Sequence, residues 1–193
     1  LPKVKLHLSN GKPGYTTSLE IQNCLDLNNS NIMISDVGDN SDFGSDRLNS
    51  PDHKEILVNS DVVILVNWAS NWKGTDLLKH VLKNSPKALH FVDPADIQTR
   101  SKEFCTLLRD PNNMIDILSI NENECNSLLF ELDLKNFYLS KKYDRINIEL
   151  AIKELAKQLG VFIDLHTRYG CACSYGDEVY FEYNIKNTIL RNL

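Results

Sequence analysis

The sequence contains no run of about 18 or more apolar residues, so it predicts no membrane-spanning helix. It also lacks the charged and then apolar start of a secretory signal peptide. Its five cysteines are odd in number and irregularly spaced, which argues against a disulfide framework and favours reduced thiols. Basic residues are not in excess, and the net charge of −5 argues against a nucleic-acid partner. These absences predict a cytoplasmic protein that binds neither membranes nor nucleic acids.

The 193 residues, of which 42% are hydrophobic, are enough to bury one good core. Strand-like and helix-like segments alternate through the middle, which predicts an α/β fold with a mostly parallel sheet covered on both faces. Early strands and a late hairpin are expected to add antiparallel edges. The run 61–67 (DVVILVN) is the clearest candidate for a buried strand. The other expected strands are 4–8, 15–21, 31–35, 88–92, 115–120, 161–165, 171–175 and 178–183, and the expected helices are 51–58, 75–83, 99–108, 121–132 and 143–159.

Glycines mark two expected ends. Gly160 stands at the carboxyl end of the helix expected at 143–159, and Gly176 with Asp177 closes the late hairpin. The apolar stripe of that helix is predicted to be Ile146, Leu150, Ala151, Leu155 and Leu159.

The stretch 114–132 (MIDILSINENECNSLLFEL) is the one around which the chain is arranged. A short apolar strand ends there in a polar cluster, and a helix with Cys125, Leu128, Leu129 and Leu132 on one face follows. In an open α/β sheet, ligands bind where strands end and helices begin, because the helix amino terminus offers unpaired N–H groups. We therefore expect the binding site at this edge of the sheet.

Each polar residue at the strand ends allows a structural and a functional interpretation. Asn121 and Glu124 have the spacing of a capping box, yet the same carboxylate can hold a hydrated magnesium ion. Glu122 is expected to be a solvated acid in the first helical turn. Arg100 is suited to phosphate, although an ion pair at the surface is the favoured interpretation.

Two further groups leave alternatives open. In the segment 67–72, two tryptophans and two asparagines follow a strand, which is compatible with core packing or with the rim of a pocket for a polar ligand. His166, Cys171 and Cys173 suggest zinc, but a Cys-x-Cys spacing without a second pair is unusual for a structural zinc site. Two small buried thiols on one strand face fit the pattern as well.

The order of four segments resembles the ribokinase-like (PfkB) carbohydrate kinases. Asp93-Pro94-Ala95-Asp96 through Arg100 is similar to a "D-P-x…R" strand end, and the segment 116–124 is similar to a "D-(apolar)-N-x-x-E" signature. The segment 162–170 lies where the family has a strand, a threonine and a glycine of the nucleotide site, and Gly38-Asp39-Asn40 matches a loop before the middle strands. The resemblance implies a ribokinase-like three-layer sandwich in a single domain, 1–193, with residues 1–30 forming a lid or sheet-edge strands.

This resemblance implies transfer of the terminal phosphoryl group of ATP to a hydroxyl of a sugar or sugar-like acceptor, with Mg²⁺. The small-molecule partners would be the acceptor and the nucleotide, and a homodimer is left open. The implied cofactor-binding residues are Asn121, Glu124, Thr167, Gly170 and Arg100, with Glu124 also as the metal ligand. The implied acceptor-binding residues are Gly38, Asn40, Asn67 and Asp93.

Two parts of the family pattern are missing. The Gly-Gly-Asn region near the amino terminus and the Gly-Ala-Gly-Asp motif that holds the general base are absent, so no catalytic base is nominated and it is expected beyond Leu193. The chain is therefore expected to be an inactive central fragment of a longer kinase. The alternatives are a non-catalytic module that binds a nucleotide or phosphorylated ligand, and a thiol- or zinc-dependent enzyme that uses His166 and the cysteines.

Overall fold

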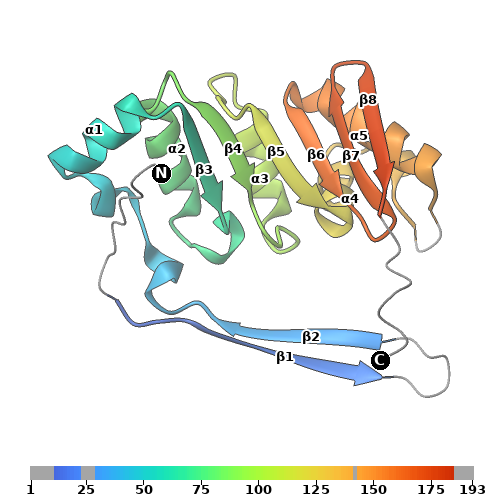
Figure 1. The fold of residues 1–193 in the computed structure, drawn as a ribbon, viewed down its shortest axis with the longest axis horizontal. Coiled ribbons are helices and arrows are strands. Elements are labelled where there is room, and N and C mark those ends of the chain that lie inside the picture. Colours follow the sequence, from blue (N-terminus) through green and yellow to red (C-terminus); the bar gives the residue numbers. More distant parts are fainter. Residues whose placement is uncertain (1–10, 23–28, 141–142, 185–193) are drawn as a thin grey trace, which may run out of the picture.

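The computed structural model describes residues 11–22, 29–140 and 143–184, which form two separate sheets (Figure 1). Strands β1 (Tyr15–Gln22) and β2 (Asn29–Asp36) pair with each other as an antiparallel ribbon. The larger sheet has the strand order β3-β4-β5-β6-β7-β8. The strands of this sheet are β3 (Val62–Val66), β4 (Leu89–Asp93), β5 (Ile117–Asn121), β6 (Phe162–His166), β7 (Gly170–Tyr175) and β8 (Glu178–Tyr183).

Strands β3 to β6 run parallel, and β7 and β8 are antiparallel. This confirms the predicted mostly parallel sheet with antiparallel edge strands. The predicted hairpin at 171–183 is also confirmed, and Gly176 in its turn has a φ of +58°, which glycine adopts without strain. The strand predicted at 4–8 lies outside the described residues.

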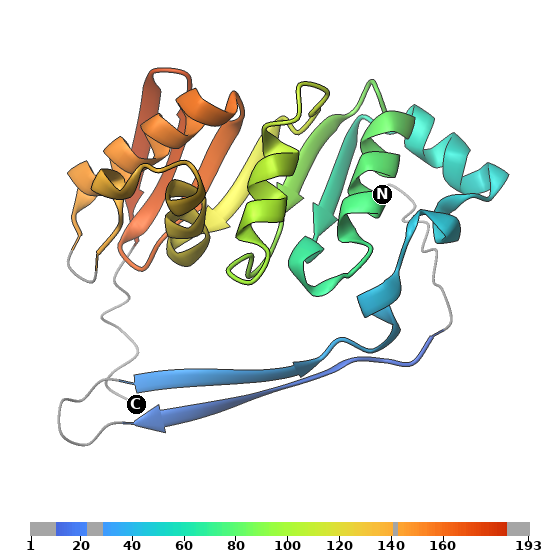
Figure 2. The same cartoon turned by 180° about the vertical axis from the view of Figure 1, so that it is seen from behind.

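The helices α2 (Gly74–Asn84), α3 (Ser101–Leu108), α4 (Glu122–Glu131) and α5 (Arg145–Leu159) cover one face of the sheet, and α1 (Pro51–Asn59) packs beside α2 (Figures 1 and 2). The third layer that the resemblance implies is not formed by the described residues. No helix among these residues is both long and apolar enough to cross a membrane.

The core lies between this helical layer and the sheet. Alternate strand residues point into it, such as Leu118 and Ile120 of β5, both fully buried. Each such aliphatic side chain contributes about 1.5–3 kcal/mol of transfer free energy relative to an exposed one. The helices contribute Leu128 and Leu129 from α4 and Ile152 from α5, which are fully buried as well.

Two predictions about burial are wrong. Strand β3 is an edge strand, and Ile64 on its uncovered face is 65% exposed, because no described helix packs on that side. On α5, Ile146 and Leu150 are exposed, although Ala151, Leu155 and Leu159 are buried as expected. The buried stripe includes Ile148, Ile152 and Ala156 instead, which places six apolar side chains on one helical face.

The ribbon lies along the edge toward which β3, β4, β5 and β6 point (Figure 1). Gly14 and Gly38 let the segment that enters β1 approach the segment that leaves β2 closely. A Cβ on Gly38, which has a φ of +58°, would stand 2.4 Å from the carbonyl oxygen of Lys12. The backbone N–H of Asp39 donates to that same carbonyl at 3.1 Å. Glycine is therefore required by backbone packing at position 38.

Candidate functional site

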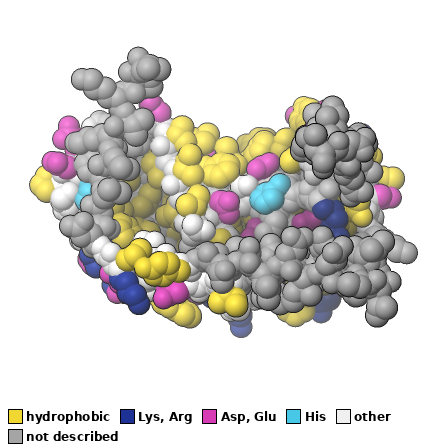
Figure 3. Space-filling view, turned by 60° about the horizontal axis from the view of Figure 1, so that its bottom comes forward, with side chains coloured by type: hydrophobic (Ala, Val, Ile, Leu, Met, Phe, Trp, Pro, Cys, Tyr) yellow, Lys and Arg dark blue, Asp and Glu magenta, His cyan; other side chains and the backbone are white. Residues whose placement is uncertain are grey.

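The carboxyl ends of the four parallel strands meet at one edge, where polar side chains gather. Val66 pairs with Asp93 and Asn121 pairs with His166, so the two ends within each of these strand pairs lie level. Val92 of β4 pairs with Leu118 of β5, so β5 and β6 extend further along this edge than β3 and β4. Figure 3 brings this edge forward and shows acidic side chains and a histidine among apolar side chains. The edge is where ligands bind in open α/β sheets.

Asn121 and Glu124 form a complete capping box at the start of α4. The Asn121 side chain accepts hydrogen bonds from the backbone N–H groups of Asn123 at 2.8 Å and Glu124 at 3.1 Å. The carboxylate of Glu124 accepts from the backbone N–H of Asn121 at 2.8 Å. Such a box satisfies amides that otherwise lack partners in the first helical turn. The structural interpretation of this pair is confirmed, and it leaves the second carboxylate oxygen of Glu124 outside the box.

The carboxyl of Glu124 is only 2% exposed, and its environment disfavours ionisation. Its pKa is raised to about 7, first by burial and then by the carboxylates of Asp93 and Asp96, while the amide of Asn121 lowers it. The last residue of β4 and an acid of the loop that follows it therefore act electrostatically on Glu124. A cation in this position would relieve their mutual repulsion.

The acids around Glu124 do not form a metal cage within the part of the chain that the structure describes. Among the described residues, no group of three or more His, Cys, Asp or Glu side chains is arranged to hold a metal ion. Mg²⁺ usually keeps several waters and uses one or two carboxylates together with substrate phosphates. Glu124 with its acidic neighbours fits that second arrangement, a hydrated ion brought by a nucleotide. His166 and Cys171 are exposed and face each other across β6 and β7.

Thr167 and Gly170 build the turn between β6 and β7. The Thr167 hydroxyl donates to the carbonyl of Gly170 at 2.8 Å and accepts from the N–H groups of Tyr169 and Gly170, each at 3.1 Å. A Cβ on Gly170 would meet the backbone carbonyl of Glu182 at 2.2 Å. The side chain of Asn184 also donates to the carbonyl of Thr167 at 3.0 Å. Both predicted nucleotide-site residues thus fix the conformation of this turn.

Arg100 lies beneath the loop that follows β3. Its guanidinium donates to the carbonyl of Asn71 at 2.6 Å, and to those of Trp68 and Ala69 at 3.3 Å. Two further hydrogen bonds, both 3.0 Å long, join it to the carboxylate of Glu103. The Arg100 side chain is 10% exposed and that of Glu103 is 47% exposed, so the ion pair lies at the surface on the side of the carboxylate. The hydrogen bond from Arg100 lowers the pKa of Glu103.

The two tryptophans near Arg100 have different environments. Trp68 is buried against Phe104, with ring centroids 4.7 Å apart, whereas Trp72 is 77% exposed. Asn71 is buried and donates to the carbonyl of Phe43 at 2.7 Å. Core packing therefore accounts for one tryptophan, and Asn71 connects two loops.

The residues predicted to contact the acceptor lie in two regions, the turn after β2 and the ends of β3 and β4. Asn67 has a φ of +58° and its N–H donates to the carbonyl of Asp93 at 3.0 Å, which joins the ends of β3 and β4. Gly38 and Asn40 lie in the turn of 3-10 helix Gly38–Asp42. This turn meets the loop after β3 where the N–H of Trp72 donates to the carbonyl of Ser41 at 2.8 Å.

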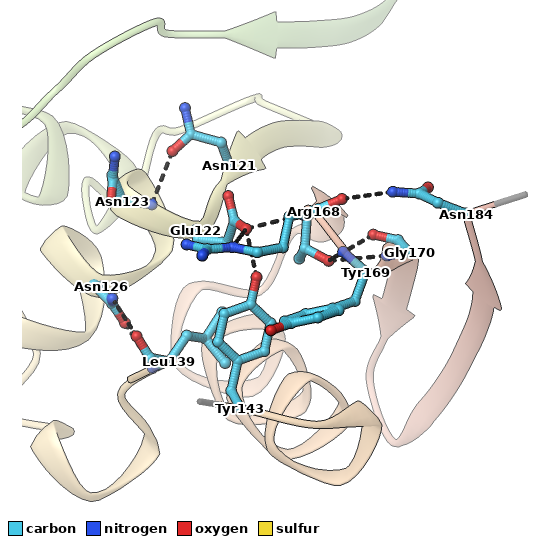
Figure 4. Close-up of polar contacts among 11 residues, drawn as sticks. Asn121, Glu122, Asn123, Asn126, Leu139, Tyr143, Arg168, Tyr169, Gly170 and Asn184 are labelled. Atoms are coloured by element: carbon cyan, nitrogen blue, oxygen red, sulfur yellow. Dashed lines mark hydrogen bonds and ion pairs between the residues drawn. The ribbon is translucent and has the colours of Figure 1, made fainter. Parts of the chain in front are cut away.

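Sequence reasoning missed a polar cluster of Glu122, Tyr143 and Arg168 (Figure 4). The expectation that Glu122 is a solvated acid is wrong, because its side chain is 21% exposed and accepts from the Tyr143 hydroxyl and from the backbone N–H of Arg168 at 2.9 Å. Burial raises the pKa of Glu122, but these hydrogen bonds outweigh it and the pKa is lowered. Burial and the bond to Glu122 raise the pKa of Tyr143 to about 12.

No protein-family model matches the sequence, and neither does any curated protein. Solved structures match the fold. The adenosine kinase of Trypanosoma brucei brucei has a TM-score of 0.62 at 13% identity, over 92% of this chain and 51% of that one. The Anopheles gambiae adenosine kinase in complex with P1,P4-di(adenosine-5) tetraphosphate has a TM-score of 0.64 at 13% identity, and the match covers 90% of this chain and 49% of that kinase. The chain has a ribokinase-like fold.

An ADP-dependent kinase in complex with fructose-6-phosphate and ADPβS gives a TM-score of 0.64 at 16% identity. That match covers 86% of this chain and 42% of the kinase. The chain thus spans about half the length of the solved ribokinase-like structures that it matches. At these identities the likeness describes the fold.

Proposed function

We propose that the chain carries the central sheet of a cytoplasmic PfkB-type kinase. It would transfer the terminal phosphoryl group of ATP to a hydroxyl of a sugar or sugar-like acceptor in the presence of Mg²⁺. One observation carries the proposal: the N-x-x-E pair of Asn121 and Glu124 lies at the carboxyl end of a central strand in a fold shared with solved kinases. Phosphoryl transfer depends mainly on positioning and on neutralising charge, which residues at such an edge can supply.

In this proposal, Asn121 and Glu124 hold the hydrated Mg²⁺ that accompanies the nucleotide. The ion supplies the positive charge that neutralises the phosphates. The turn of Thr167 and Gly170 lines the nucleotide. Arg100 supports the site indirectly, because its guanidinium fixes the loop after β3.

The acceptor would lie between the loop of Gly38 and Asn40 and the strand ends at Asn67 and Asp93. The hydrogen bond from the N–H of Trp72 to the carbonyl of Ser41, which joins the loop after β3 to this turn, supports such a shared site. The general base would come from outside residues 1–193, so binding is the property of this chain to measure first.

The test is a thermal-shift titration with ATP and ADP, each with and without Mg²⁺. A ligand at 100 times its dissociation constant stabilises the folded state by about 2.7 kcal/mol. We expect a magnesium-dependent shift in the wild type that is lost in Glu124→Gln. Asp144→Asn is the matched control, because Asp144 makes the capping box of α5 and lies outside the proposed site. Flat titrations in this chain and in the full product of its gene would refute the proposal.

A non-catalytic module that binds a nucleotide or phosphorylated ligand is the second candidate. It is favoured by the internal hydrogen bonds that already occupy Asn121, Thr167 and Arg100. The full gene product distinguishes the two: magnesium-dependent binding with ATP turnover supports the kinase, and binding without turnover on any sugar-type acceptor supports the module.

A further inference from the structure

Three basic side chains lie in the described loops that follow β3, β4, β5 and β6, namely Lys73, Arg100 and Arg168. Lys73 is paired with Asp42 at 3.2 Å, and all parts of the Arg100 guanidinium are engaged beneath its loop. Arg168 differs, because its side chain is 62% exposed. Among these three cations, Arg168 is the one open to a ligand.

The backbone at Arg168 is held rigidly. Arg168 follows Thr167 in the turn between β6 and β7, and that turn is closed by the hydrogen bonds of the Thr167 hydroxyl and of Asn184. The N–H of Arg168 donates to the Glu122 carboxylate at 2.9 Å, which ties the turn to the start of α4. A guanidinium on such a frame loses little backbone entropy when it binds a ligand.

The side chain of Arg168 is oriented by Glu122 and Tyr143. Its Nε approaches the same Glu122 oxygen at 3.4 Å, and its guanidinium lies 5.8 Å from the ring centre of Tyr143. Tyr143 in turn packs edge-on against Tyr169, with ring centroids 5.0 Å apart (Figure 4). Glu122 also accepts the Tyr143 hydroxyl and a backbone N–H, so its negative charge is shared among three donors. An arginine held through Nε keeps its outer pair of nitrogens for a second, bidentate partner.

The negative charge at this edge disfavours a bound anion unless a cation such as Arg168 offsets it. Glu124, Asp93 and Asp96 make the adjoining region acidic, so a nucleotide polyphosphate needs a protein cation in addition to its metal. A planar guanidinium matches the geometry of phosphate oxygens.

We propose that Arg168 binds a phosphate group of the nucleotide and that Glu122, with Tyr143, is its positioning residue. This inference rests on the proposed function and assigns the phosphate contact of that site to the turn between β6 and β7. Arg100, the other arginine at this edge, keeps its structural role in the loop after β3.

The test uses isothermal titration calorimetry with two probes, MgATP and inorganic pyrophosphate, which presents phosphates without a base or sugar. In Arg168→Gln we expect both dissociation constants to rise about tenfold or more, as for loss of one charge-assisted bidentate contact. Arg168→Lys keeps the charge and is expected to recover part of the affinity. Glu122→Gln keeps an acceptor for Tyr143 and is expected to weaken binding by less than Arg168→Gln.

Arg145→Gln is the matched control, because Arg145 is an exposed arginine that pairs with Glu149 at 2.6 Å and lies near an aromatic ring, Phe181. Its dissociation constants should equal those of the wild type, and the melting temperature of Arg168→Gln should be unchanged. Wild-type affinity in Arg168→Gln overturns the phosphate contact and leaves the proposed function standing. A wild type that binds neither probe refutes the proposed function and this inference together.

Discussion

The buried carboxyl of Glu124 should make the stability of the fold depend on pH in a defined direction. Its pKa is raised from 4.5 to about 7, so the folded state binds a proton more tightly than the unfolded state. The stabilisation is fully present below about pH 4.5, where both states are protonated, and is lost as the pH rises through about 7. The difference between the two pKa values corresponds to roughly 3 kcal/mol, an upper value for a side chain that is 2% exposed.

Glu124→Gln removes this titration and keeps an oxygen that accepts the backbone N–H of Asn121. As the pH rises from 5 to 8, we expect the free energy of unfolding of the variant to increase relative to that of the wild type. The difference should approach about 3 kcal/mol. Urea unfolding at a series of pH values measures the difference, and subtraction removes the titration of all other groups. Asp144→Asn, at the exposed cap of α5, should show no such rise through pH 7.

The same ionisation should appear in ligand binding. Mg²⁺ requires the carboxylate form of Glu124, so magnesium-nucleotide affinity should increase as the pH rises through about 7 and binding should release a proton. The Gln variant should lose both effects. A stability difference between wild type and variant that stays constant from pH 5 to 8 would refute the assignment of the raised pKa, whatever the binding shows.

Two further predictions concern the frame of the site. Gly170→Ala should destabilise the fold by about 1–3 kcal/mol in thermal unfolding, because the added methyl group meets a backbone carbonyl of β8. Gly160→Ala has open space around its methyl group, so its loss of stability should be only the strain of its positive φ. Equal losses of stability in the two variants would contradict this reasoning. Leu118→Ala should lower the free energy of unfolding by about 2–5 kcal/mol, because Leu118 is fully buried. Ile64→Ala should lower it far less, because Ile64 is 65% exposed. A large loss of stability in Ile64→Ala would show that this face of β3 is covered.

The sequence predicts local features of this fold well, because short-range chemistry decides them. Asn121 and Glu124 form the box that their spacing indicates, and Gly160 has the positive φ expected of a helix C-cap. Ser50 with Pro51 likewise begins α1, where the Ser50 hydroxyl accepts from the N–H of His53. Each of these signals involves residues within one helical turn.

Burial is less predictable, because it depends on which elements pack together. Strand β3 is apolar at every position, so its sequence cannot distinguish a central strand from an edge strand with one open face. Helix α5 carries apolar residues on more than one side, including Ile146, Ile148 and Leu150. The stripe that contains Ile148 faces the sheet, and only the position of the sheet selects it.

The cluster of Glu122, Tyr143 and Arg168 is not predictable from sequence at all. Its members are 21 and 46 residues apart and come from the start of α4, the approach to α5 and the turn after β6. In the sequence, Glu122 looks like an ordinary acid in the first turn of a helix, where a negative charge is stabilised by the helix dipole. Its partners become apparent only when β5 and β6 lie side by side.

The two charged groups proposed to bind nucleotide should be separable by pH. Glu124 acts through its metal and ionises near pH 7, whereas the pKa of Arg168, already high for any arginine, is raised further by its hydrogen bond to Glu122. The loss of affinity in Arg168→Gln should therefore be the same at pH 6 and pH 8, while the loss in Glu124→Gln should grow between them. In the double variant the two losses add if metal and guanidinium act on different phosphates, and fall short of the sum if they share one.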